Sequence, residues 1–195
     1  MNPLAHSDLL PLEAYARERD AFRARAIAHR KSRKLHLGEH VTLQFEDRLT
    51  IQYQVQEILR TEKIFERAGI EEELEAYNPL IPDGRNLKAT MLIEYEDPEV
   101  RKRELMKLRG VEHELSLQVA GHAPVRAIAD EDLPRSNEEK TSAVHFLRFE
   151  LDDAMIADFK RGADVVVRIV HQACRVERHL SIEQRRALMV DFDQA

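Results

Sequence analysis

The pattern of apolar and polar positions is most informative between Phe45 and Asn78. On a helix with 100° between residues, two opposite faces of this stretch collect apolar side chains. One face carries Ile51, Val55, Ile58, Leu59 and Phe65, and the other carries Leu49, Tyr53 and Ile64. A helix that is apolar on two sides is usually sandwiched between other elements. The pattern therefore predicts a long central helix inside the fold.

Glu62 lies near the middle of the first apolar face. Burying a carboxylate against apolar side chains costs roughly several kcal/mol unless it is paired, hydrogen-bonded or protonated. We therefore expect Glu62 to be buried and paired with a cation, and the basic run Arg23–Lys34 offers candidates. The alternative is a site carboxylate with a raised pKa, or a metal ligand.

A helix is expected upstream, from about Leu12 to Arg33. The run Arg23–Lys34 within and after it holds six Lys or Arg residues and no acid, whereas Glu57–Glu75 holds seven glutamates and three basic residues. The simplest interpretation is that the basic run is solvated or packs beside the acidic helix. A clamp for phosphate or another anion and a nucleic-acid contact are the alternatives.

After residue 80 the periodicity changes from helical to two-residue alternation, which indicates strands. The stretch Leu115–Val119 is followed by a bend at Gly121 and by Val125–Ala129, so these two strands should pair as a hairpin. The other expected strands are Val41–Phe45, Leu87–Tyr95, Val144–Leu151 and Val165–Val170. Residues 130–141 are polar and predict a surface loop.

Helix starts are marked by capping residues. Asp97 precedes a proline, Asp152 precedes a short apolar helix, and Ser181 with Gln184 forms a capping box that opens the terminal helix. Helices first and mainly consecutive strands afterwards are typical of an α+β fold. We expect one domain over residues 1–195, mainly helical over 1–80 and mainly sheet over 81–195. Its N-terminal helices, one of them long and central, should pack on a mainly antiparallel sheet of about five strands, with a C-terminal helix.

Composition narrows the function classes. The net charge is −6, which argues against bulk attraction to nucleic acid or anionic membranes. Cys174 is the one cysteine, so neither a disulfide framework nor a cysteine-rich metal site can form within the chain. No stretch approaches 18 consecutive apolar residues, and the N-terminus lacks the features of a signal peptide. The cytoplasm is the expected location.

No nucleotide-binding glycine motif, nucleophile elbow or zinc-protease motif is present. His36 and His40 flank Gly38, which interrupts the helix that a paired metal site would need. His171 and Cys174 should point to opposite faces of a strand, which disfavours a local Cys–His dyad. The residues therefore predict no metal site and no cofactor.

One polar constellation is a candidate binding site. Gln56, Glu57 and Arg60 lie on the seams of the central helix, and Glu94 lies on the polar face of the strand Leu87–Tyr95. If these faces meet, they enclose a pocket that needs a ligand, a metal or water to satisfy it. The alternative is a closed network of ion pairs.

Several segments resemble an uncharacterised bacterial family of similar length. They are FEDRLTIQYQVQEILRTEKIF, EELEAYNPLIPDGRNLKATMLIEYEDP, HFLRFEL and RRALMVDF. The resemblance singles out Gln56, Glu57, Arg60, Glu62, Tyr77, Asn78, Pro82, Thr90, Glu94 and His171. It transfers no catalytic role to any of them.

The resemblance also implies a setting, because genes of this family often neighbour those of rubrerythrin-like proteins and iron–sulfur oxidoreductases. We therefore expect a non-catalytic accessory or assembly factor of a redox or oxidative-stress system, with such proteins as partners. The alternative is an enzyme, or a binder of a metal or small anionic ligand, that uses the helix–sheet pocket. The sequence leaves the oligomeric state open, a homo-oligomer included.

Overall fold

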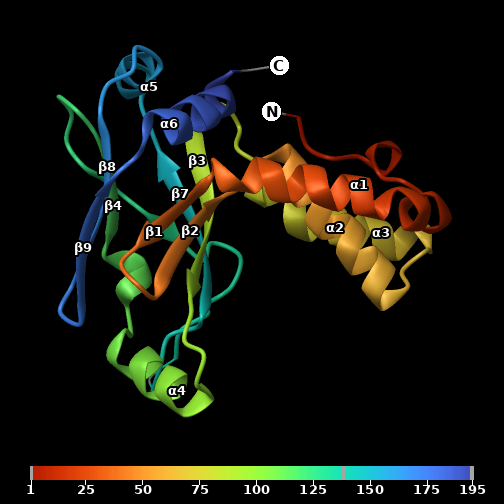
Figure 1. The fold of residues 1–195 in the computed structure, drawn as a ribbon, viewed down its shortest axis with the longest axis horizontal. Coiled ribbons are helices and arrows are strands. Elements are labelled where there is room, and N and C mark those ends of the chain that lie inside the picture. Colours follow the sequence, from red (N-terminus) through yellow and green to blue (C-terminus); the bar gives the residue numbers. More distant parts are fainter. Residues whose placement is uncertain (1, 138, 194–195) are drawn as a thin grey trace.

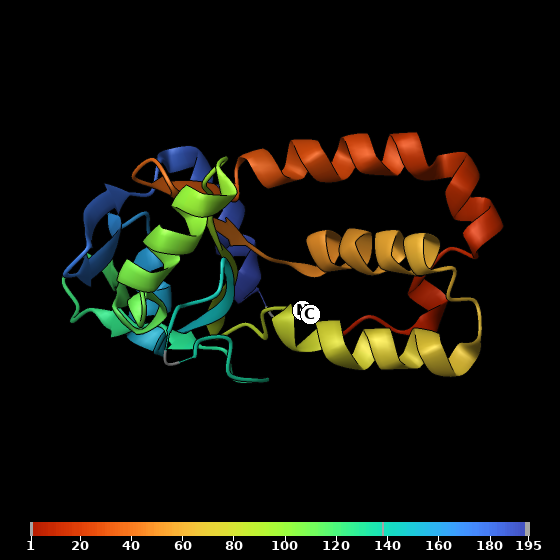
Figure 2. The same ribbon diagram turned by 90° about the horizontal axis from the view of Figure 1, so that it is seen from below.

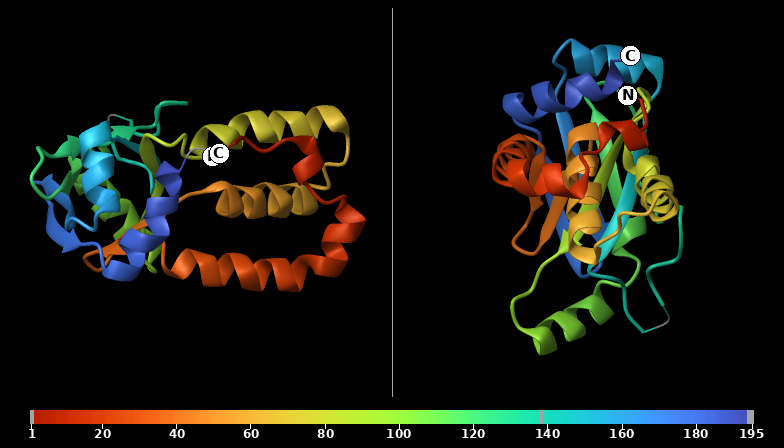
Figure 3. Two further views of the ribbon diagram at one scale, coloured as in Figure 1. Left: turned by 90° about the horizontal axis from the view of Figure 1, so that it is seen from above. Right: turned by 90° about the vertical axis from the view of Figure 1, so that its right-hand side faces the viewer.

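The computed structural model describes residues 2–137 and 139–193. Figure 1 shows two parts, a group of β-strands with helices around it and a helical arm that projects to one side. We call them the sheet lobe (residues 34–45 and 86–193) and the helical arm (residues 2–31 and 48–81). The two termini lie close together near the junction of the two parts (Figure 3).

The helical arm contains three α-helices and two short 3-10 turns. In chain order they are η1 (His6–Asp8), α1 (Leu12–Lys31), α2 (Arg48–Glu62), α3 (Arg67–Tyr77) and η2 (Asn78–Leu80). Helix α2 lies between α1 and α3 (Figure 2), which confirms that the central helix is sandwiched. Its buried face packs in a small apolar core of Leu4, Ile51, Val55, Leu59, Leu74 and Ile81.

Local chemistry sets the ends of α2. The Asp47 side chain accepts a hydrogen bond from the Thr50 backbone N–H, and the Thr50 hydroxyl accepts one from the Asp47 N–H. This reciprocal pair satisfies two groups at the start of the helix. At the other end Lys63 adopts φ = 58°, a left-handed conformation that stops the helix at Glu62.

The sheet lobe is built from two antiparallel sheets. One has the order β1-β2-β3-β7-β6 and the other has the order β5-β4-β8-β9. The strands are β1 (Lys34–Leu37), β2 (Val41–Phe45), β3 (Asn86–Ile93), β4 (Leu115–Val119), β5 (Val125–Arg126), β6 (Ile128–Ala129), β7 (Val144–Glu150), β8 (Val165–His171) and β9 (Cys174–His179). The α+β class is therefore confirmed. The expected sheet of about five strands has a second sheet beside it.

The chain changes sheet within the segment that was expected to be a single strand. Leu117 of β4 pairs with Val125 of β5, as the hairpin prediction requires. After Ala127, β6 pairs instead with β7 in the other sheet. The two sheets share one apolar core, to which buried residues such as Leu43, Phe149 and Val167 contribute.

Helices close the ends of the sheet lobe. They are α4 (Pro98–Lys107), η3 (Val111–His113), α5 (Asp153–Lys160), α6 (Ile182–Met189) and η4 (Val190–Phe192). Asp97, Asp152 and Ser181 cap α4, α5 and α6 through their side chains, as predicted. Within the described ranges, no helix combines the length and apolar character needed to cross a bilayer.

The basic run is mostly solvated, as expected, because Arg23, Arg25, Lys31 and Lys34 are exposed. Helix α1 packs against α2, which carries the start of the acidic stretch, while α3 lies on the opposite side of α2 (Figure 2). Arg33, by contrast, is completely buried. It donates hydrogen bonds to the carbonyls of Phe45, Glu46 and Ala187 and forms an ion pair of 2.5 Å with Asp191. The buried cation of the run therefore joins α1 to the C-terminal turn.

Candidate functional site

Gln56, the first of the predicted site residues, has a structural partner. Its side chain is fully buried. Its Oε1 accepts a hydrogen bond of 2.6 Å from the Leu10 N–H, and its Nε2 donates one of 3.2 Å to the Leu10 carbonyl. The amide thus pairs with the main chain as a neighbouring strand would, and it fixes the N-terminal segment against α2.

Glu57 lies at the centre of an ion-pair network between α1 and α2. Arg19 binds both carboxylate oxygens, at 2.8 and 2.7 Å, and the Tyr15 hydroxyl donates at 2.7 Å. Arg60 approaches at 3.5 Å. The hydrogen bonds from Arg19 lower the pKa of Glu57 to about 2, so this group stays ionised at neutral pH. For Glu57 and Arg60 the arrangement is the closed ion-pair network.

The expectation for Glu62 is wrong. The residue is exposed at the far end of the arm. The predicted phase of the helix was correct. Because α2 ends at Glu62, however, the Glu62 side chain lies beyond the buried part of the apolar face. Its acidic neighbour Glu73 has a pKa raised first by burial and then by the Glu62 charge, which indicates repulsion rather than pairing.

The structure does not bring Glu94 to the central helix. Glu94 follows β3 at the end of the sheet that holds the β1–β2 turn, and it accepts a hydrogen bond of 3.0 Å from the Thr42 hydroxyl. There it lines a surface hollow of about 900 Å³ together with His40 and Tyr95, whose rings stack. Arg60 belongs to α2 of the helical arm. Among the described residues, the predicted helix–sheet pocket of Gln56, Glu57, Arg60 and Glu94 does not form.

His171 ends β8 and is buried. Its ring contacts the Arg109 carbonyl at 3.2 Å and accepts from the Ala173 N–H at 3.2 Å. Cys174 is its register partner on β9, and burial raises the pKa of this thiol, which disfavours the reactive thiolate. The contacts of His171 therefore hold a turn and the chain after α4 in place.

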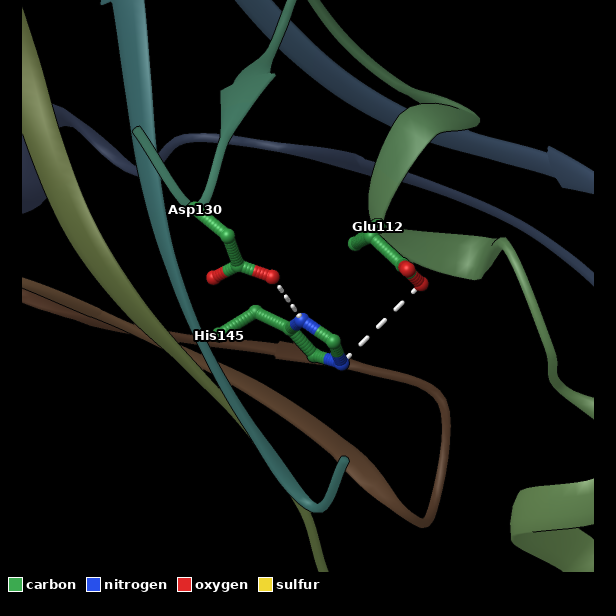
Figure 4. A group of neighbouring side chains, drawn as sticks. All are labelled: Glu112, Asp130 and His145. Carbon is green, nitrogen blue, oxygen red and sulfur yellow. Dashed lines mark hydrogen bonds and ion pairs between the residues drawn. The ribbon is translucent and has the colours of Figure 1, made fainter. Parts of the chain in front are cut away.

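A different set of residues forms a buried charged cluster in the sheet lobe. Glu112 of η3, Asp130 after β6 and His145 of β7 place one ligand atom each within 4.8 Å of one another (Figure 4). His145 is completely buried and Glu112 is 2% exposed. We call Glu112, Asp130 and His145, with the hydroxyls of Ser136 and Thr141, the buried cluster.

Strand alternation puts His145 inside. Along β7, His145, Leu147 and Phe149 are buried, while the residues between them are half-buried. His145 therefore occupies the end of an apolar row that faces the core. Asp130 is positioned by an unusual backbone conformation, φ = 51°, and its Oδ1 accepts a hydrogen bond of 3.0 Å from the Phe146 N–H.

A chain of hydrogen bonds joins the Asp130 carboxylate to the Glu112 carboxylate through His145 and Thr141. Asp130 Oδ2 lies 2.6 Å from His145 Nδ1. His145 Nε2 lies 2.8 Å from the Thr141 hydroxyl, which donates to Glu112 Oε2 at 3.0 Å. The Ser136 hydroxyl binds the other Glu112 oxygen. Burial raises the pKa of Glu112, but the hydrogen bond from Ser136 and the neighbouring His145 ring outweigh it, so the pKa lies below its usual value.

The imidazole has a further contact at Nε2, where the Ser142 carbonyl lies 3.1 Å away. The Ser136 and Thr141 hydroxyls lie 2.9 Å apart, and either can donate to the other. His145 therefore lies between two carboxylates, Asp130 on the Nδ1 side and Glu112 on the Nε2 side.

No pattern in the sequence predicts this cluster. The sequence predicts a surface loop over residues 130–141 and places His145 in a strand. One signal was available, because His145 falls at an inward position of an apolar row, where an unpaired polar group would be costly. Its partners could not be identified, since Glu112 and Asp130 come from other segments.

A third feature lies at the end of the arm. Phe65 is 71% exposed there, beside a groove of about 400 Å³. We call this the arm-tip groove, and it is lined by His6, Ser7, Leu9, Leu10, Pro11, Leu12, Leu59, Ile64, Phe65 and Ile70. Most of these side chains are apolar, so the arm presents an apolar surface away from the sheet lobe.

Comparisons with known proteins place the chain in a family. A crystal structure from Burkholderia pseudomallei, described as a novel protein of unknown function, is 49% identical and has a TM-score of 0.94. The match covers 98% of this chain and 100% of the other. No curated protein matches the chain. The family described as protein of unknown function, DUF3501, matches residues 3–192, and the chain belongs to this family.

Proposed function

We propose that this member of the DUF3501 family is a non-catalytic accessory protein that binds a partner protein through the arm-tip groove. The single observation that carries the proposal is Phe65, which is 71% exposed beside a groove with mainly apolar walls. An exposed aromatic ring next to such a groove is typical of the anchor residues of protein interfaces. The arm projects from the sheet lobe, so a partner can reach this surface freely.

The partner class follows from the resemblance of the sequence. It implies rubrerythrin-like proteins and iron–sulfur oxidoreductases, and hence a redox or oxidative-stress system. Support for a non-catalytic role comes from the predicted site residues, because Gln56, Glu57 and His171 already have structural partners. The alternative of an enzyme in a helix–sheet pocket has less support, because Glu94 bonds to Thr42 in the sheet lobe whereas Arg60 belongs to α2 of the arm.

A pull-down with the purified chain tests the proposal. Wild type and two variants are used to capture proteins from a bacterium that carries a gene of this family. Phe65→Ser removes the exposed ring, and Val170→Ser is the matched control, because Val170 is 54% exposed on the sheet lobe. We expect wild type and Val170→Ser to capture a rubrerythrin-like or iron–sulfur protein, and Phe65→Ser to bind it at least tenfold more weakly.

Two results would contradict the proposal. Equal capture by all three chains would remove the arm-tip groove from the interface, and recovery of neither partner class would remove the redox assignment. Gel filtration is run in parallel. If Phe65→Ser converts a homo-oligomer to monomers, the groove is occupied by a second copy of the chain instead.

A further inference from the structure

We propose that the buried cluster is a binding site for a divalent first-row transition metal. Its principal ligands are His145 Nε2 and a carboxylate oxygen of Glu112. The hydroxyls of Ser136 and Thr141 and the Ser142 carbonyl complete the set, and Asp130 orients the imidazole. No motif in the sequence marks this site, because its donors come from three separate segments of the chain.

The distances between the donors fit one ion. Two ligands bound to the same metal at about 2.0–2.2 Å lie roughly 2.8–4.2 Å apart, depending on their angle. His145 Nε2 and Glu112 Oε2 are 3.9 Å apart, which is too long for a hydrogen bond. Thr141 Oγ1 lies 2.8 Å from Nε2, and the Ser142 carbonyl lies 3.1 Å from it. The oxygens therefore converge on the space between imidazole and carboxylate.

The charged groups around the cluster also suit a cation. Arg135 forms an ion pair of 3.8 Å with Asp130, but the same guanidinium binds both oxygens of Asp132. Glu112 has two histidines at 3.9 Å, the exposed His113 and the buried His145. A divalent ion beside Glu112 supplies the positive charge that stabilises a buried carboxylate.

Asp130 completes a known arrangement of metal-binding histidines. Such a histidine usually donates its second ring N–H to a carboxylate or carbonyl, which fixes the ring and raises its basicity. Asp130 Oδ2 is 2.6 Å from Nδ1, on the side of the ring away from Glu112 (Figure 4). Asp130 is itself held by the Phe146 N–H. The ring therefore presents Nε2 to the site.

The donor types select the class of metal. One imidazole nitrogen with carboxylate, hydroxyl and carbonyl oxygens suits Mn²⁺, Fe²⁺ or Zn²⁺, whereas Ca²⁺ and Mg²⁺ take oxygen ligands. The cluster contains no thiolate, so it offers no particular preference to soft ions. Residues 131–137, most of which are exposed, hold Ser136 against Glu112.

Calorimetric titration of the EDTA-stripped full-length chain with MnCl₂ tests the site. We expect one Mn²⁺ per chain, and a melting temperature about 5–10 °C higher at a hundredfold excess over Kd. Glu112→Gln should abolish saturable binding, and Asp130→Asn should weaken it 10–100-fold. His171→Gln is the matched control, because His171 is also a buried strand histidine but contacts main chain. It should bind as wild type does.

The proposal is overturned by an absence of saturable Mn²⁺ binding in wild type, since the cluster is then a closed hydrogen-bond network. It is also overturned if Asp130→Asn binds as tightly as wild type. If Glu112→Gln does not fold, Asp130→Asn and Thr141→Val decide. Equally tight binding of CaCl₂ would contradict the assignment to transition metals.

Discussion

The helical arm and the sheet lobe bury polar groups in different ways. In the arm, side-chain amides pair with the main chain of the N-terminal segment: Asn78 with Leu4 at 2.7 and 2.9 Å, and Gln56 with Leu10. In the sheet lobe, charged side chains meet one another in the buried cluster. Neutral amides position a segment without placing charge in the core, whereas the charged cluster requires compensation. The polar contacts of the arm therefore stabilise the fold, whereas the charged side chains of the cluster can also bind a ligand.

The two parts also differ in the size of their apolar cores. The arm has one small cluster around Val55 and Leu59, while both sheets of the lobe contribute to one large core. Regions with few buried apolar contacts open at lower free energy than the rest of a protein. We expect the arm to unfold before the sheet lobe. The following changes test this contrast, from the largest effect to the smallest.

Arg33→Met removes the buried cation at the junction of the helical arm and the sheet lobe. The change leaves Asp191 and Asp47 without their buried cation, so we expect a loss of about 3–5 kcal/mol in urea unfolding. Lys31→Met is the control, because Lys31 is exposed, and it should stay within about 0.5 kcal/mol. An Arg33→Met chain as stable as the control would show that the junction does not hold the parts together.

This loss should depend on pH. Burial raises the pKa of Asp191 to about 7, and Arg33 opposes this rise. In Arg33→Met, the Asp191 carboxyl therefore keeps its proton in the native state near neutral pH. In the unfolded state the same carboxyl has lost its proton. Stability then falls as pH rises. Urea unfolding at pH 6 and pH 8 should show a larger deficit at pH 8, and a constant deficit would contradict the role of Asp191.

Gln56→Ala separates local from global stability. It leaves the Leu10 N–H and carbonyl unpaired, so we expect a loss of about 1–3 kcal/mol. Amide hydrogen exchange should accelerate in α1 and α2 and stay unchanged in β3 and β7. The control is Gln172→Ala, at an exposed turn position. Equal acceleration in both parts would mean that the arm and the lobe unfold as one unit.

Glu57→Gln should have the smallest effect on the free energy of unfolding, and this effect should depend on pH. The pKa of Glu57 is lowered to about 2, chiefly by Arg19, so its stabilising contribution is full above about pH 5. It disappears as pH falls through about 2. Because Glu57 is partly solvated, we expect a wild-type advantage of about 1 kcal/mol at pH 7 that shrinks toward pH 2. An advantage that is constant with pH would contradict this.

The sequence by itself determined the local structure. Three local features were predicted correctly because they depend on neighbouring residues. They are the caps at Asp97, Asp152 and Ser181, the alternation along β3 and the two-sided apolar pattern of α2. The α+β class follows from their order. The strands β1 and β9 were missed, because Lys34–Leu37 and Cys174–His179 carry charged side chains on one face and become strands through their sheet partners.

The tertiary structure decided which polar side chains meet. The prediction that a cation of the basic run pairs with Glu62 was wrong, and the sequence could not identify Asp191, 158 positions after Arg33, as the partner of Arg33. The same holds for Glu112, Asp130 and His145, which come together only when the chain crosses from one sheet to the other. Helical or strand periodicity reports the face on which a residue lies. The group opposite that face depends on how distant segments pack, and no local pattern encodes it.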